Sequence, residues 1–394
     1  MIEPVRSPLK IDVKGLNRPI RNPSFNKLFL GSIPLVAGIL LAFMIPGRLK
    51  ASDFMLIAWG PGQELIKTGI VNANYPYPIW TVLVMLPFTI WPLQTAMSLW
   101  FACNLLMLAA SLAILIPLLG LEISLLMFGV LVIFSGFFLP VLTSIWLGQL
   151  SILSLLILAL TTSLFLNRRW TWLGIVLGFS FIKPQVMILL AILILLWALW
   201  HRRWQTLLGF SGVMLLFTLI SLPFISSPAQ IIGGGIGSHL TEYIMRTSTI
   251  WGFLMSIGLP WFIPLIISIG LLAWMGISWW SKIREKELGG DQVLFLFSAT
   301  ILVNLITVPY SWMHNLVLLL LPVGYSLALA YRLKRRDRIG WLILLFFIMH
   351  PLMLALFVAF NGPTHTQAYQ VIPALLIIPV LWYLDKQITV PQTR

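Results

Sequence analysis

The chain has 394 residues, of which 59% are hydrophobic and only 9% are charged, and its formal net charge is +14. A soluble domain averages roughly 45–50% apolar and about 25% charged residues, so this composition excludes an ordinary soluble protein. The apolar runs lack the period-two alternation of barrel strands, and they predict an all-α polytopic membrane protein. Basic cytoplasmic loops account for the positive charge, so no nucleic-acid partner is expected. A single cysteine, Cys103, excludes an intrachain disulfide.

Residues 1–28 are polar and basic, and they are predicted to form a cytoplasmic tail. The first apolar run, at 29–46, is expected to be an uncleaved membrane anchor. The transmembrane domain is expected over 29–386, followed by a cytoplasmic tail over 387–394. Placing every basic cluster inside gives about twelve transmembrane helices with both termini cytoplasmic. Those clusters lie at 168–169, 201–203, 282–286 and 332–338.

Two long segments are expected on the extracytoplasmic side, at 47–94 and 224–260, with juxtamembrane helices in the first. The other spans follow from apolar runs of about 20 residues, the length that crosses a bilayer core. They are predicted at 95–117, 121–140, 145–166, 205–223, 261–281, 291–309, 313–331, 339–360 and 368–385.

One pair of helices is expected to be short. About 32 residues separate Arg169 from Arg202, which is too few for two full-length spans. Pro184 disfavours helical backbone at the preceding lysine and interrupts the apolar run. We therefore predict two short helices, over 171–182 and 185–200, that meet at Lys183-Pro184-Gln185.

Few ionisable residues are expected outside the membrane or at membrane depth, and any polar chemistry there must use them. The cations are Arg48, Lys50, Lys67, Lys183 and Arg246, and the acids are Asp53, Glu64 and Glu242. Asp53 directly precedes an apolar stretch, FMLIAW. This stretch predicts a short interfacial helix that ends at Gly60-Pro61-Gly62. On this stretch alone, Asp53 is either a first-turn acid favoured by the helix dipole or a functional carboxylate.

Polar residues recur in a set order among the apolar helices, and with them the chain resembles a known family. The segments are SDF (52–54), YPYPIW (75–80), Gly148-Gln149, Lys183-Pro184-Gln185 and Ser311-Trp312-x-His314. Over about residues 50–330 they resemble the polyprenol-phosphate-mannose-dependent glycosyltransferases, glycosyltransferase family 87 of the GT-C superfamily. The chain departs from the family pattern at three places. Ile79 replaces the second proline of Tyr-Pro-Pro, and Val308-Pro309 and His314-Asn315 stand for Ser-Pro and His-His.

The resemblance implies a GT-C-type bundle at the plasma membrane, with the active site on the extracytoplasmic face. It implies transfer of one hexose, mannose in the family, from a polyprenyl-phosphate sugar donor to a glycolipid or glycan acceptor. Asp53 matches the aspartate that this superfamily uses as general base in the first outer loop, in a displacement that inverts the anomeric centre. Lipid, donor and acceptor are the expected partners.

The remaining candidate residues each have a structural alternative. Those for donor phosphate or sugar are Lys183, Gln149, His314, Arg246 and Gln185; those for stacking on sugar or lipid are Trp59, Tyr75, Tyr77 and Trp312. Lys183 is either a phosphate ligand or a snorkelling lysine. Gln149 could equally make an interhelical hydrogen bond, His314 could cap its helix, and Arg246 could pair with Glu242. The aromatic residues could be interfacial belt residues.

No metal or other cofactor is expected. The outer acids are too few and too scattered for a carboxylate cage, and no His or Cys spacing suits zinc. Two alternative functions stay open at this point: a flippase or transporter of lipid-linked sugars, and a glycan polymerase or ligase that uses a polyprenyl diphosphate.

Overall fold

The computed structural model describes residues 52–72, 74–231, 243–285, 288–332, 335–360 and 367–389. Every regular element in these ranges is helical, and the described residues form no strand, which confirms the predicted all-α class. The predicted N-terminal tail, the first apolar run, Arg48, Lys50 and Glu242 lie outside the described residues. The last helix, α19 (Val371–Thr389), extends three residues into the predicted C-terminal tail.

Six helical segments of the described chain are long and apolar enough to cross a membrane. They are Leu93–Leu118 (α5), Trp204–Phe224 (α11, Trp204–Ser221, with the following 3-10 turn), Phe262–Ile283 (α14), Gly290–Thr307 (α15), Met313–Tyr331 (a 3-10 helix, Met313–Leu319, then α16, Leu320–Tyr331) and Ile339–Phe360. The last consists of α17 (Arg335–Phe347), a π-helical turn at Ile348–Leu352 and α18 (Met353–Phe360).

A seventh span is possible by length if a bent pair counts as one, namely α6 (Leu125–Gly136) and α7 (Leu139–Leu147), which meet at 70°. The sequence divides this region differently, at 121–140 and 145–166. The predicted break at 141–144 lies inside α7. This helix ends instead at Gly148, because that residue is left-handed (φ +73°). The prediction of about twelve spans also counts the shorter apolar helices, and it stays a prediction.

The shorter helices complete the bundle. They are α4 (Trp80–Thr89), α8 (Ser151–Leu166), α9 (Trp170–Phe179), α10 (Ile188–Trp200) and α13 (Ile250–Ser256). Helix α9 packs along α11, α8 packs against α5, and α15 lies among α14, α16 and α19. The core is therefore centred on α8, α15 and α16, whose side chains are buried on most sides.

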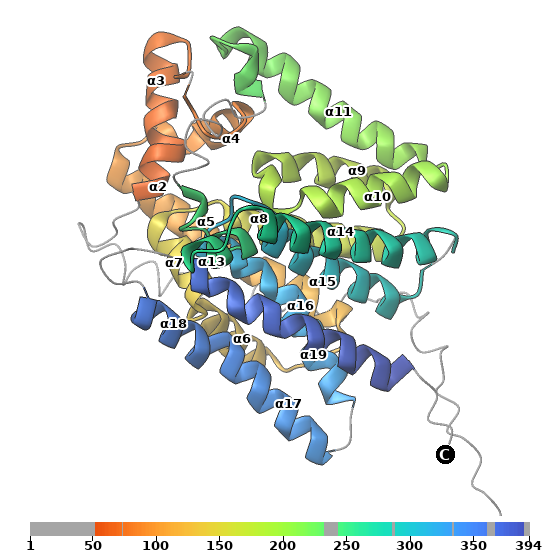
Figure 1. The fold of residues 1–394 in the computed structure, drawn as a ribbon. Helices are drawn as coiled ribbons and strands as arrows, with labels where there is room; N and C mark the ends of the chain where they lie inside the picture. The colour runs from red at the N-terminus through yellow and green to blue at the C-terminus, as the bar shows by residue number, and fades with distance from the viewer. Residues whose placement is uncertain are drawn as a thin grey trace, which may run out of the picture.

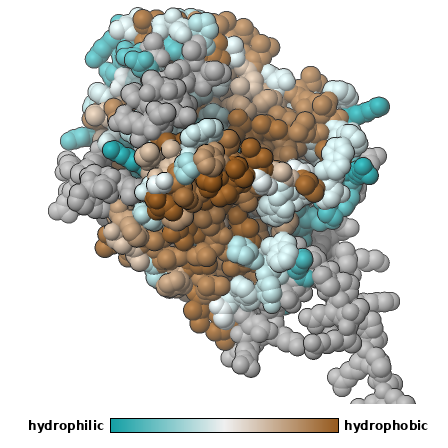
Figure 2. Space-filling view, viewed as in Figure 1, coloured by the Kyte–Doolittle hydropathy of each residue, from teal (hydrophilic) through white to brown (hydrophobic). Residues whose placement is uncertain are grey.

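The two ends of the bundle differ in chemistry. The connections α10–α11 and α14–α15, which carry basic clusters, lie on one side of the molecule, and α2 (Ser52–Phe54), α7 and α13 lie on the opposite side (Figure 1). Between these sides, the visible face is covered mainly by hydrophobic side chains, with hydrophilic ones toward its edges (Figure 2). This is the distribution expected of a protein that spans a bilayer.

The first described helix does not end where the sequence predicts. It continues from α2 through a π-helical turn (Met55–Trp59) into α3 (Gly60–Thr68), so the predicted stop at Gly60-Pro61-Gly62 is wrong. Proline at 61 removes the amide that would normally bond the carbonyl of Ile57. The Tyr75 hydroxyl donates to that carbonyl at 2.7 Å, so the helix continues without an orphaned acceptor.

Glycine lets this continued helix pack closely on α4, the second juxtamembrane helix of the predicted 47–94 segment. A Cβ atom built at Gly62 would lie 2.4 Å from Cγ2 of Thr89. The hairpin of α3 and α4 is tied to the second outer segment, because the Gln230 amide donates to the carbonyl oxygens of Val71 and Asn72. The start of the second predicted outer segment is therefore hydrogen-bonded to the first.

Tyr75 gives a test of this arrangement. We expect Tyr75→Phe to lower the free energy of unfolding by about 1–3 kcal/mol, because the buried Ile57 carbonyl loses its donor. The measurement is thermal or denaturant unfolding of purified protein in detergent. Tyr383→Phe, which removes a hydroxyl from a 44% exposed tyrosine, is the control and should change stability by less than about 0.5 kcal/mol. Equal effects of the two substitutions would contradict the role given to Tyr75.

Candidate functional site

An acid, an amide and a buried cation meet where three separate segments approach one another. The Gln149 side-chain nitrogen donates to Oδ2 of Asp53, and its oxygen accepts from Nζ of Lys183 at 3.0 Å. Lys183 is 1% exposed and Gln149 is 3% exposed, while Asp53 is half-buried. One amide thus joins two opposite charges and leaves the carboxylate accessible from one side.

Hydrogen bonds continue from the lysine toward the start of the 313–319 helix. Nζ of Lys183 also donates to the Ser151 hydroxyl at 2.8 Å, and that hydroxyl donates to Oδ1 of Asn315 at 2.9 Å. The Asn315 amide in turn donates to the Ser311 hydroxyl at 3.0 Å. We call the six residues from Asp53 through Gln149, Lys183, Ser151 and Asn315 to Ser311 the polar chain.

Gln149 reaches Asp53 because of the residue before it. Gly148 ends α7 in the left-handed region, and a Cβ atom there would lie 2.5 Å from Cβ of Phe54. A side chain at 148 would therefore push the Asp53 segment away from the amide. The Trp100 indole donates to the Gly148 carbonyl at 3.0 Å and fixes this turn.

Lys183 lies at the break between two short helices, which confirms the prediction for this region. Helix α9 continues as a 3-10 turn to Ile182, a second turn covers Pro184–Val186, and α10 begins at Ile188. A broken helix inside the membrane leaves backbone groups that need partners. Thr81 and Trp80 of α4 donate to the carbonyls of Ile182 and Phe181, both at 2.9 Å.

Asn304 of α15 satisfies the other half of the break. Its amide nitrogen donates to the Gln185 carbonyl at 2.9 Å, and its oxygen accepts from the Leu189 amide at 3.0 Å. The lysine is thus held by α4 on one side and α15 on the other. This bracing argues against a snorkelling lysine, because snorkelling requires an ammonium that reaches water.

His314 lies directly before Asn315 of the polar chain and is 4% exposed. Neither ring nitrogen has a hydrogen-bond partner among the described residues. Buried polar groups in folded proteins nearly always have partners, so an unpartnered imidazole beside a lysine points to a ligand oxygen. The alternative, that His314 caps its helix, is not supported by any described hydrogen bond.

Two tyrosine hydroxyls, those of Tyr77 and Tyr310, lie close enough to Asp53 to feel its charge. Burial raises the pKa of the Tyr77 hydroxyl, and the nearby Tyr310 and Asp53 add to this effect. Tyr77 is thus a neutral hydroxyl close to the carboxylate. The Trp312 ring stands edge-on to the rings of Tyr310 and Tyr243, with centroids 5.9 and 6.1 Å apart.

Other candidates have different surroundings. Tyr75 uses its hydroxyl in the helix contact described above, and the Trp59 indole donates to the Trp91 carbonyl at 3.0 Å. Gln185 contributes its backbone carbonyl to the lysine turn. Arg246 exposes its side chain, and its described hydrogen bonds are made by its backbone. The described contacts bring none of these four side chains into the polar chain.

Sequence reasoning missed several members of the site. Ser151, Asn315, Tyr310 and the bracing Asn304 were not identified as candidates, since single polar residues in apolar helices are usually structural. A signal was present for two of them. Ser151 follows Gly148-Gln149 by two residues, and Asn315 directly follows His314, so each adjoins a residue that the motif pattern selected.

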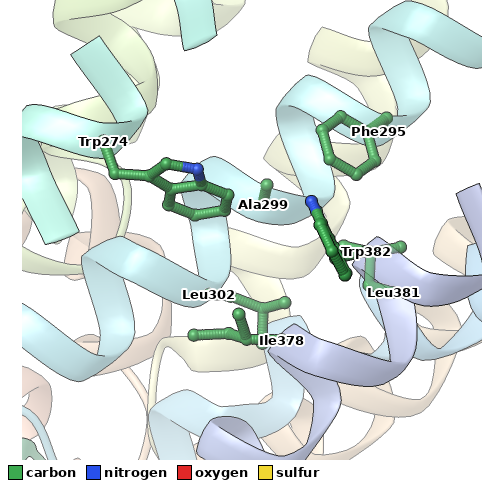
Figure 3. Close-up of a pocket in the computed structure, with 7 residues that line it drawn as sticks. All are labelled: Trp274, Phe295, Ala299, Leu302, Ile378, Leu381 and Trp382. Carbon is green, nitrogen blue, oxygen red and sulfur yellow. The ribbon is translucent and has the colours of Figure 1, made fainter. Parts of the chain in front are cut away.

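A small apolar hollow includes no residue of the polar chain in its lining. It is lined by side chains of α14, α15 and α19, and the indoles of Trp274 and Trp382 stand on either side of it (Figure 3). Its lining has no charged group, so it offers nothing to hold a phosphate. Across the described part of the chain, no three His, Cys, Asp or Glu side chains gather as metal ligands would. Metal independence stays a prediction.

A multi-pass helical membrane protein that joins a carboxylate, an amide and a buried cation at one end has the parts of a polar reaction site at a membrane surface. The family model of Glycosyltransferase family 87 matches residues 75–306, more than half of the chain. The chain therefore belongs to glycosyltransferase family 87 and is a membrane glycosyltransferase. Neither the comparison with curated proteins nor the comparison with solved structures gave a match. The matched range includes Gln149, Lys183 and Asn304, whereas Asp53 and His314 lie outside it.

The link between the two charges can be measured by a double-mutant cycle. We expect Asp53→Asn and Lys183→Met to show a stability coupling of about 1–2 kcal/mol, because each single change leaves the other charge without a counter-charge. The measurement is unfolding of the wild type, both single variants and the double variant in detergent. The Arg332–Asp291 pair, at 2.9 Å and about one-third exposed, is the control, with an expected coupling of about 0.2–1 kcal/mol. Additive effects at Asp53 and Lys183 would contradict the link.

Proposed function

We propose that this protein transfers a single hexose, mannose, from a polyprenyl-phosphate sugar to a glycolipid or glycan acceptor. The reaction takes place on the extracytoplasmic face of the plasma membrane, in a GT-C-type bundle of about twelve spans with cytoplasmic termini. The observation that carries the proposal is the placement of Asp53 and Lys183 on the two ends of the Gln149 amide.

Asp53 is the general base. Gln149 holds one carboxylate oxygen, and among the described residues the other accepts only a long 3.3 Å hydrogen bond from Ser52. That second oxygen is thus available to an acceptor hydroxyl. A hydroxyl is a weak nucleophile, and a positioned base contributes about 10²–10⁴-fold to the rate.

The leaving group is the lipid phosphate, which needs positive charge or hydrogen-bond donors. Lys183 and His314 supply these, since both are buried, lie near one another, and the His314 ring nitrogens have no partner among the described residues. The acceptor oxygen bonds to the anomeric carbon while its proton passes to Asp53. The bond from that carbon to the phosphate oxygen breaks, and its electron pair stays on the phosphate. A single displacement of this kind inverts the anomeric centre.

Tyr77, Tyr310 and Trp312 bind the sugar in this proposal. The hydroxyls of Tyr77 and Tyr310 lie near Asp53, and the Trp312 ring packs edge-on against Tyr310. Such amphipathic rings suit a sugar, which has apolar C–H faces and polar edges. No residue is assigned to a metal or other cofactor.

The decisive experiment compares wild type with Asp53→Asn in nanodiscs. The assay supplies radiolabelled polyprenyl-phosphate mannose and a pool of native membrane lipids as acceptors. We expect the variant to lose about 10²–10⁴-fold in transfer rate while donor binding persists. Glu64→Gln, an acid of α3 whose carboxylate accepts from the Asn72 backbone amide at 3.2 Å, is the control and should retain activity.

Three results would contradict the proposal. Equal transfer by wild type and Asp53→Asn would reduce Asp53 to a first-turn acid. Movement of the labelled lipid across vesicles without transfer would favour a flippase, which the family assignment already disfavours. Transfer of whole glycans from a polyprenyl diphosphate, with none from the monophosphate donor, would favour a polymerase or ligase.

A chelator tests the predicted metal independence. We expect the transfer rate of wild type to be unchanged within about twofold when EDTA is present in excess, because Lys183 and His314 provide the charge and donors that a divalent ion would supply. The measurement is the same transfer assay with EDTA and with added Mg²⁺ or Mn²⁺. Loss of activity in EDTA that added metal restores would show that a metal site was missed.

A further inference from the structure

A second hollow lies on the membrane-facing surface at the opposite end from the polar chain. It is a groove of about 510 Å³ between α10 and α14. Its lining is almost entirely apolar, and Leu196, Trp200 and Trp280 remain 50% or more exposed. A volume of ~300–1,000 Å³ is typical of sites that hold small ligands.

The depth of the groove comes from a missing side chain. A Cβ atom built at Gly276 has no neighbour within 4 Å, so the helix surface is hollow at that point. Trp280 follows one turn later, and its ring stands edge-on to Trp200 with centroids 5.8 Å apart. The two indoles therefore close the groove across its end, near the termini of both helices.

Two cations that form no ion pair with a described residue lie at this closed end. Nε2 of His201 contacts the Ile283 carbonyl at 2.7 Å, which joins the ends of α10 and α14. Arg202 directly follows His201 and Arg284 directly follows Ile283, so both arginines lie at this same end of the groove. Arg284 extends over the Trp280 ring, with its guanidinium carbon 5.9 Å from the ring centroid.

The other described charged groups at this end of the groove already have partners. Lys282 pairs with Glu285 at 2.8 Å, and Glu285 also accepts from Gln292 at 3.1 Å. Arg203 lies over the Trp170 ring at 4.7 Å. Arg202 and Arg284 are exposed and make no ion pair with a described residue. Positive charge above an apolar groove matches an anionic headgroup above a hydrocarbon chain.

We propose that this groove binds an anionic phospholipid of the leaflet on the basic side, with an acyl chain in the groove and its phosphate between Arg202 and Arg284. Arginine suits this role because its planar guanidinium can donate two hydrogen bonds to one phosphate. The site is separate from the polar chain and does not depend on the proposed transfer reaction.

The test is native mass spectrometry of protein released from nanodiscs that contain equal amounts of phosphatidylglycerol and phosphatidylcholine. We expect wild type to retain phosphatidylglycerol selectively. Gly276→Leu fills the groove and should abolish retention of the lipid. Arg202→Gln with Arg284→Gln should lower the preference for phosphatidylglycerol about fivefold for each charge removed.

Two matched controls keep the test specific. Gly270→Leu adds the same side chain to α14 at another exposed glycine with open space around its Cβ, outside the groove lining. Lys67→Gln removes one exposed cation from α3, away from the basic side. Both should retain phosphatidylglycerol as wild type does. Equal retention of the two lipids by wild type, or unchanged retention in either the groove variant or the arginine variant, would overturn the proposal.

Discussion

The hydrogen bonds of one amide, Gln149, hold the acid and the buried cation of the candidate site in place. An ammonium group that is 1% exposed is stable in a protein only when its charge is balanced and its protons are bonded. Gln149 and Ser151 accept hydrogen bonds from the ammonium, and the nitrogen of the same Gln149 amide donates to Asp53. Because the three residues come from separate segments, the same bonds that stabilise Lys183 also fix where the carboxylate stands.

Much of the architecture behind this interaction can be inferred from composition and from helix-breaking residues. The apolar runs predict an all-helical membrane protein, and Pro184 between two basic clusters predicts the pair of short helices that places Lys183 at a break. Prediction fails at Gly60-Pro61-Gly62, where a tyrosine 18 residues from Ile57 supplies the missing donor. Such a long-range hydrogen bond overrides the local signals that end a helix, and local sequence contains no trace of it.

The site residues divide in the same way. Charged residues such as Asp53 and Lys183 are visible in the sequence because a charge is rare in an apolar chain and costly in a membrane. Neutral residues such as Asn304 and Asn315 are not, since their roles depend on which backbone group or side chain happens to face them. Asn304 illustrates this, because its side-chain amide bonds the Gln185 carbonyl and the Leu189 amide, both more than 100 positions away in the sequence.

The two ends of the bundle place opposite demands on the same helices. At one end, α10 begins after the turn that buries Lys183, near a histidine, His314, whose ring nitrogens have no hydrogen-bond partner among the described residues. At the basic end, α10 terminates beside α14, where the bond from His201 to the Ile283 carbonyl joins the two helices. One 13-residue helix thus separates an acid–cation site from a basic lipid-facing mouth. A short helix at this place keeps both features within reach of the membrane surfaces, as the spacing between Arg169 and Arg202 requires.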